Sequence, residues 1–210
     1  MNTFIEHQNW RYATKKFDSS KKVSTTDLEI LKEAIRLSAS SYGLQLYKVI
    51  IIEDADLRAK LLPATFGQTQ VIDASHLIIF ANQTNIGDAE IDAYLQNASE
   101  TRSLPIEALA GYGAFMKGAI NPMPEDMKNI WASKQTYIAM ANLLHAAAEL
   151  RIDTTPMEGF NAAQFNEILG LDGLNLNASV IVPIGYRHDE DETQHHRKVR
   201  KAEKDLFIKL

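Results

Sequence analysis

The stretch RYATKKFD, residues 11–18, places Arg11, Lys15 and Lys16 within six positions of a chain whose formal net charge is −5. One interpretation is a solvated basic turn. The other is a binding site for a flat, anionic molecule, because arginine contacts phosphate through a bidentate fork and lysine acts as a point charge. The rest of the sequence distinguishes between a solvated turn and a binding site.

Three further segments have a related chemistry. Residues 40–43 (SSYG) stand at an expected helix end just before a strand, and residues 156–160 (PMEGF) lead from a strand into a glycine turn. Residues 198–200 (KVR) add two cations near the C-terminus. Small hydroxyl side chains and glycine allow backbone N–H groups to approach a planar ligand. The four segments together therefore favour a site for a planar anion.

Other kinds of site are not supported. The stretch GYGAFMKG (111–118) begins like a dinucleotide fingerprint, but its third glycine is missing and no strand precedes it. A chain without cysteine has no disulfides, thiolate metal sites or cysteine nucleophiles. Two adjacent histidines, His195 and His196, are poorly placed to bind one metal ion, so no metal site is expected. The acidic run 189–192 is interpreted as solvated.

Composition indicates one globular domain, residues 1–210, with 45% hydrophobic and 23% charged residues. The negative net charge argues against general nucleic-acid binding. The first ten residues lack the pattern of a secretory signal, and the longest apolar span, 138–150, is too short to cross a bilayer. We therefore expect a cytoplasmic protein with neither a membrane nor a nucleic-acid partner.

Hydrophobic periodicity predicts the elements that must position the four segments. Helices are expected at 3–10, 24–40, 55–64, 88–119 with a break at 103–105, about 121–150, and 161–170; strands are expected at 46–52, 76–82, 153–160 and 177–186. A capping box from Thr26 to Glu29 would start the second helix. This order lacks a regular βαβ alternation, so it predicts an α+β fold with a mixed central sheet surrounded by helices. Residues 187–210 are expected to form an arm that reaches a partner subunit.

The chain resembles the FMN-dependent nitroreductase family, in particular its NAD(P)H-dependent, oxygen-insensitive group. RYATKKFD resembles the family's R-x-S-x-[KR]-x-[FY] motif, and SASSYGLQLYKVIII resembles its S-P-S-x-x-N-x-Q-P-W-x-F segment. IDASHLIIFA and YIAMANLLHAAAELRIDTTPMEGF resemble its second strand and its central helix followed by P-x-E-G-F. The similarity extends from about Thr3 to Arg200, nearly the whole chain.

The resemblance implies where one end of an FMN molecule would bind. Arg11, Lys198 and Arg200 would hold its phosphate. Tyr12 and Ala13 would line the ribityl chain and the ring edge.

The resemblance also assigns groups along the ring. Lys15 would face the pyrimidine N1/O2 edge, with Gln68 and Gln70 as further polar candidates there. Residues 156–159, namely Pro156, Met157, Glu158 and Gly159, would run along the opposite side, with the N–H groups of Glu158 and Gly159 near flavin N5. Lys15 and Glu158 are the catalytic candidates.

Family members are homodimers with the flavin at the interface, so the resemblance implies that Ser40, Ser41 and Gly43 serve the partner's flavin. Phe115 and Met116 are candidates for the substrate slot. Several positions depart from the family pattern: Ala13 replaces the usual serine, Gly43 replaces an asparagine, and Gly67 stands where an asparagine is common. These departures affect the choice of electron acceptor more than FMN binding.

The implied function is electron transfer from NAD(P)H through FMN to nitroaromatics, quinones or similar flat acceptors by a ping-pong cycle. Two alternatives remain open within flavin binding: a carrier, sensor or scavenger with little turnover, and a reductase of pteridines or enones. Simpler structural roles also remain. Lys15 could form a surface ion pair, Glu158 could cap the helix that follows Asn161, and Phe115 and Met116 could be core residues.

Overall fold

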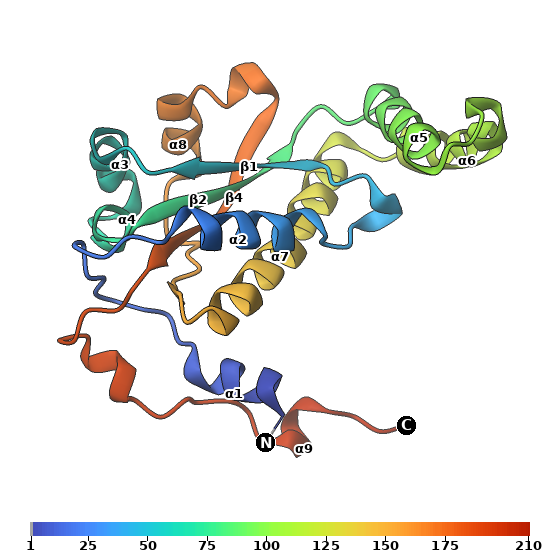
Figure 1. Ribbon diagram of the computed structural model, residues 1–210. Coiled ribbons are helices and arrows are strands. Elements are labelled where there is room, and N and C mark those ends of the chain that lie inside the picture. The colour runs from blue at the N-terminus through green and yellow to red at the C-terminus, as the bar shows by residue number, and fades with distance from the viewer. Residues whose placement is uncertain (1) are drawn as a thin grey trace.

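The computed structural model describes residues 2–210. Its four-stranded sheet has the order β1-β2-β4-β3, with β1 at Tyr47–Ile52, β2 at His76–Gln83, β4 at Leu176–Gly185 and β3 at Asp153–Thr154 (Figure 1). All three ladders are antiparallel. Parallel pairing in the described chain is limited to an isolated bridge between Ala13 and Thr154. The α+β class is confirmed; the sheet itself is antiparallel and not mixed, and the parallel bridge lies outside its named strands.

The two central strands, β2 and β4, are buried on both faces. Successive side chains of a strand point to opposite faces, so Ile78 and Phe80 join one core cluster while Leu77 and Ile79 join another. The sheet therefore needs a helical layer on each side, which explains why its central strands read as nearly continuous apolar runs.

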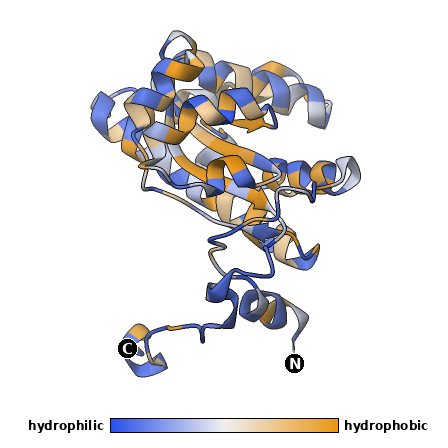
Figure 2. Cartoon of the chain, turned by 90° about the vertical axis from the view of Figure 1, so that its left-hand side faces the viewer, coloured by the Kyte–Doolittle hydropathy of each residue, from blue (hydrophilic) through white to orange (hydrophobic). Residues whose placement is uncertain are grey.

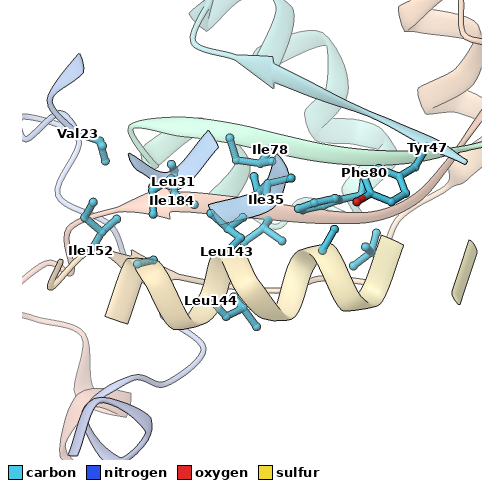
Figure 3. Packing of buried hydrophobic residues seen from close by; sticks show 14 residues of the cluster. Val23, Leu31, Ile35, Tyr47, Ile78, Phe80, Leu143, Leu144, Ile152 and Ile184 are labelled. Carbon is cyan, nitrogen blue, oxygen red and sulfur yellow. The ribbon is translucent and has the colours of Figure 1, made fainter. Parts of the chain in front are cut away.

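The first layer consists of α2 (Thr25–Arg36) and α7 (Glu125–Glu149). Leu31 and Ile35 of α2 and Leu143 of α7 pack with Ile78 and Phe80 of the sheet, as Figure 3 shows. The opposite layer contains α3 (Ala55–Leu61), the 3-10 turn Leu62–Thr65, α4 (Gln70–Asp73) and α8 (Ala162–Leu169). Together they hold the central strands in a dry interior.

A separate pair of helices, α5 (Asp88–Arg102) and α6 (Ala110–Ile120), projects beside the sheet, joined by the 3-10 turn Ile106–Leu109 (Figure 1). Their own core cluster includes Ile91 and Met116 and reaches Ala132 in the first half of α7. This pair accounts for the expected helical stretch with its break near residue 103.

Both chain ends lie on the other side of the molecule. Helix α1 (Thr3–Trp10) and the C-terminal segment run beside each other, away from the sheet (Figures 1 and 2). The segment ends in α9 (Glu203–Leu206), and the apolar residues Leu206, Phe207, Ile208 and Leu210 are exposed. No helix in the described part of the chain is long and apolar enough to cross a membrane.

Two local predictions are corrected. The N-cap of α2 is Ser24, whose side chain accepts a hydrogen bond from the N–H of Asp27, so the helix does not start with a capping box at Thr26. The expected strand at 153–160 is regular only at Asp153–Thr154. Beyond it, Thr155 donates its N–H to the carbonyl of Pro183, which has no N–H to return the bond, and Met157 forms an isolated bridge to Ile181.

Candidate functional site

A pocket of about 360 Å³ lies between the end of α1 and the C-terminal segment. It brings together two stretches that are almost 190 residues apart, and its lining includes Arg11, Tyr12, Ala13, Lys198 and Arg200. These five were singled out from the sequence, and the structure places them around one cavity. The rest of the lining was not assigned to an FMN site from the sequence: Asn9, Trp10, Thr193, Gln194, His196 and Arg197.

Burial and neighbouring cations lower the proton affinity of Arg11 and Lys198. Burial, followed by the charge of Arg200, lowers the pKa of Arg11, and burial together with both arginines lowers the pKa of Lys198. Lys198 is fixed by donating its Nζ protons to the backbone carbonyls of Gln8 and Arg11. The Nε of Arg11 is buried and has no hydrogen-bond partner among the described residues. A polyanion in the pocket would reduce the mutual repulsion and supply an acceptor.

The basic stretch continues from the pocket along the sheet edge. Ala13 bridges Thr154, and the hydroxyl of Thr155 donates to the carbonyl of Thr14. Thr155 directly precedes Pro156, so the first and third sequence segments lie against each other. Lys15 is exposed, and its ammonium has no hydrogen bond or ion pair within the described residues, which excludes the surface ion-pair interpretation.

The Pro156–Gly159 segment also contacts the loop that contains Gln68. The amide of Gln68 donates to the carbonyl of Gly159 at 2.8 Å, and a Cβ added at Gly159 would meet that same nitrogen at 3.3 Å. Gln70 lies buried in the first turn of α4, and Met157 is buried in the core cluster of that layer. The side chain of Met157 therefore packs inward, and only its backbone can face a ligand.

The carboxylate of Glu158 accepts a hydrogen bond from the hydroxyl of Tyr137 on α7. Burial, assisted by this bond, raises the pKa of Tyr137 to about 12, so the phenol is protonated at neutral pH and remains the donor. The N-cap of α8 is Asn161, whose side chain accepts from the N–H of Gln164. Glu158 therefore does not cap that helix.

Asp191 corrects the interpretation of 189–192 as a solvated run. Its side chain is only 3% exposed and accepts hydrogen bonds from the backbone N–H groups of Lys15 and Lys16 and from the hydroxyl of Tyr12. Burial alone would raise its pKa, but these bonds and those from Thr193 lower the pKa of Asp191 to about 2. Asp189, Glu190 and Glu192 are exposed, as expected.

Arg187 packs against the rings of Trp10 and Tyr12, at the start of the basic stretch. The guanidinium of Arg187 lies 4.4 Å from the ring centre of Trp10 and 4.6 Å from that of Tyr12, and it pairs with the buried Asp153 at 2.6 Å. Cation–π contacts with partly buried rings are favourable. Arg187 thus connects the end of α1 to the start of β3.

The second sequence segment lies elsewhere. Ser41 donates its N–H to Gln135 in the first half of α7, and the ring of Tyr42 contacts Phe115 and Trp131. Ser40, Ser41 and Gly43 do not line the pocket beside α1, and Figure 1 shows their loop near α5 and α6, far from that helix. In one chain, therefore, the second segment does not meet the other three.

The two substrate candidates differ in exposure. Phe115 is 60% exposed on α6, whereas Met116 is fully buried in the cluster of α5 and α6. Met116 is therefore a core residue, which corrects its assignment to a substrate slot. Adjacent residues on a helix point about 100° apart, so the burial of one is compatible with the exposure of the other.

Sequence reasoning missed Asp191, Tyr137 and Arg187. Asp191 stands in a run of four acids with no periodic pattern, and Tyr137 lies on a helix that is apolar on most sides. Only the pairing of the chain at residues 16–18 with that at 186–188 brings Asp191 to Lys15. The signal that the sequence itself offered is that the acidic run 189–192 lies shortly before the basic segment 198–200.

Comparison with known proteins identifies the family of the chain. The model of the nitroreductase family matches residues 9–186. The chain is 36% identical over 195 residues to YfkO of Bacillus subtilis (strain 168), a protein named for NAD(P)H nitroreductase activity, covering 87% of this chain and 88% of that one. It is 34% identical over 207 residues to the major NAD(P)H-flavin oxidoreductase of Aliivibrio fischeri, covering 95% of both.

Solved structures share the fold. A crystal structure from Exiguobacterium sibiricum 255-15 in complex with FMN has a TM-score of 0.85 at 23% identity, covering 99% of this chain and 97% of that one. A nitroreductase-like protein from Streptococcus mutans has a TM-score of 0.87 at 15% identity, covering 100% and 99%. The family match spans most of the chain, and the relatives exceed 30% identity over nearly their whole lengths. This chain belongs to the nitroreductase family.

Proposed function

We propose that this chain is an FMN-dependent oxidoreductase that takes electrons from NAD(P)H and passes them, in a ping-pong cycle, to nitroaromatics, quinones or similar flat acceptors. The carrying observation is the pocket beside α1, where Arg11, Lys198 and Arg200 surround a cavity and the buried Nε of Arg11 has no acceptor among the described residues. The oxygens of a phosphate are the acceptors that such a cluster binds best. The residues present therefore fit the phosphate of FMN.

Bound FMN supplies hydride chemistry, and the chain supplies binding and electrostatics. Arg11, Lys198 and Arg200 neutralise the phosphate. Lys15, whose ammonium meets no partner among the described residues, offers that ammonium to the edge of the ring where negative charge accumulates on reduction. The carbonyl of Gly159 is occupied by Gln68, which holds the neighbouring backbone N–H groups in a fixed direction.

In this proposal Tyr137 orients the side chain of Glu158. Its hydroxyl holds the carboxylate of Glu158, so that the backbone of Glu158 and Gly159, and not a mobile negative charge, faces the ligand. Phe115 is the exposed aromatic group available to a flat acceptor. The requirement for NAD(P)H further supports a cytoplasmic location.

The proposed active form is a homodimer. Its support is that Ser40, Ser41 and Gly43 lie far from the pocket of their own chain, so a complete site needs them from a second copy. The exposed apolar residues at the end of the C-terminal arm are also what a segment that covers a partner requires. Each subunit would then extend its C-terminal arm over its partner and contribute its second sequence segment to the partner's site.

The first test is the visible spectrum of the purified protein, before and after anaerobic addition of NADH or NADPH. We expect a flavin spectrum that bleaches, followed by reoxidation when a quinone or nitroaromatic is added. A flavin spectrum that persists with both nucleotides would favour a flavin-binding protein with little turnover. A protein that takes up no chromophore after incubation with FMN would overturn the proposal.

A further inference from the structure

Asp191 is a buried carboxylate that has no part in the proposed chemistry, yet it touches both halves of the site. Its Oδ2 accepts from Lys15 N–H at 2.8 Å, Lys16 N–H at 3.2 Å and Tyr12 hydroxyl at 2.9 Å. Its Oδ1 accepts from the N–H and the hydroxyl of Thr193. Five donors on one carboxylate leave it little freedom to move.

The partners of Asp191 belong to opposite ends of the chain. Tyr12, Lys15 and Lys16 come from the basic stretch, and Thr193 is the second residue of the 3-10 turn Glu192–His195, which leads to Lys198. The N–H of His188 also donates to the carbonyl of Lys16, so the two strands of chain are paired just before the carboxylate. Asp191 therefore connects the basic stretch to the C-terminal segment through hydrogen bonds to both.

We infer that Asp191 is a positioning residue of the flavin site, which holds the backbone at Lys15 and the phosphate-binding arm in one arrangement. This inference rests on the proposed function. Backbone N–H groups bound to a buried carboxylate have a fixed direction, and the direction of the Lys15 backbone sets where its free ammonium can reach. If either the basic stretch or the C-terminal segment moved, the Lys15 ammonium would no longer lie at a fixed distance from the cations of Arg11 and Lys198.

The isosteric change Asp191→Asn tests the charge and the geometry together. All five partners donate, and the N–H groups of Lys15, Lys16 and Thr193 cannot become acceptors. Whichever way the new amide turns, its NH₂ group therefore faces at least one backbone donor. The matched control is Asp189→Asn, which removes the same charge from an exposed side chain two positions earlier.

Three measurements are compared in the wild type and the two variants. We expect Asp191→Asn to weaken FMN binding roughly 10- to 100-fold, the loss of a charge-assisted hydrogen bond. Amide hydrogen exchange at Lys15 and Lys16 in the FMN-free protein should become faster. The reduction potential of the bound flavin should become more negative, and Asp189→Asn should leave all three unchanged.

A double variant separates positioning from general loosening of the fold. In a Lys15→Ala background, Asp191→Asn should change the flavin potential less than it does in the wild type, because the cation that it positions is gone. Equal changes in both backgrounds would contradict the inference. If Asp191→Asn does not fold, Thr193→Val, which removes one donor to Oδ1, is the milder variant expected to shift affinity and potential in the same direction.

The outcomes distinguish the two proposals. A wild-type protein that does not bind FMN refutes the proposed function. A wild-type protein that binds FMN, with unchanged FMN affinity, amide exchange and potential in every folded variant at 191 and 193, refutes the inference alone.

Discussion

Lys15 and Lys16 are sequence neighbours with different surroundings. Both donate their backbone N–H groups to Asp191, but Lys16 pairs its ammonium with Glu190 whereas the Lys15 ammonium meets no partner among the described residues. An exposed pair such as Lys16–Glu190 contributes little to stability. A single unpaired cation beside the proposed ring edge is therefore the group most able to influence a bound flavin.

Lys15→Ala is expected to lower the reduction potential of the bound flavin. Reduction places negative charge near the pyrimidine edge, so a cation there stabilises the reduced state more than the oxidised state. A charge-assisted hydrogen bond contributes roughly 1.5–3 kcal/mol, and about 1.4 kcal/mol corresponds to about 30 mV for a two-electron couple. The decrease should therefore be roughly 30–65 mV in a redox titration, while Lys16→Ala serves as the control and should change the potential little. An unchanged potential in Lys15→Ala would refute its assignment.

Asp191 should make the fold sensitive to acid. Its pKa in the folded chain is about 2, below the ordinary value of 3.8, so its ionised form stabilises the fold. This contribution is complete above about pH 4 and is lost as the pH falls through about 2; a shift of this size corresponds to roughly 2 kcal/mol. Urea unfolding from pH 5 to pH 2 should show the wild type losing about that much more free energy of unfolding than Asp191→Asn. Parallel pH profiles would contradict the lowered pKa.

At the scale of elements, the sequence predicted the helices and central strands because their patterns are local. The apolar positions of α2 recur at helical spacing, and β2 and β4 each contain a continuous apolar run, residues 77–81 and 180–184. Two predictions went wrong, one because residue type does not choose between neighbouring caps and one because a contact distant in sequence decides. Both Ser24 and Thr26 are plausible N-caps by residue type, and the isolated bridge at Met157 depends on Ile181, which is distant in sequence.

The start of α2 offers a direct comparison of the two caps. Ser24→Ala removes the acceptor for the N–H of Asp27 and should lower the free energy of unfolding by about 1 kcal/mol. Thr26→Ala lies inside the first turn and should change it by only a few tenths of a kcal/mol. Chemical denaturation of both variants gives the comparison; an equal or larger loss for Thr26→Ala would return the cap to the position that the sequence suggested.

At the scale of the whole molecule, the candidate site is assembled from both ends of the chain on a rigid sheet. The sequence singled out cations at each end, because Arg11, Lys15 and Lys16 fall within six positions near the N-terminus and the KVR segment, residues 198–200, lies near the C-terminus. It did not show what joins the stretches, since Asp191 and Arg187 gain their partners only through the pairing of residues 16–18 with 186–188. Nor could residue types alone distinguish the exposed Phe115 from the buried Met116.

The C-terminal arm carries the last prediction. Phe207 and Ile208 are 67% and 88% exposed in the single chain, and burying each against a second copy would contribute about 1.5–3 kcal/mol. The double change Phe207→Ser/Ile208→Ser should therefore raise the dimer dissociation constant more than about tenfold in sedimentation equilibrium. FMN affinity should fall with it, because the proposed site takes Ser40 to Gly43 from the partner. Lys201→Ser/Lys204→Ser, which changes the same arm without removing apolar surface, is the control and should leave the dimer intact. An undiminished dimer in the Phe207/Ile208 variant would show that the arm does not join the subunits.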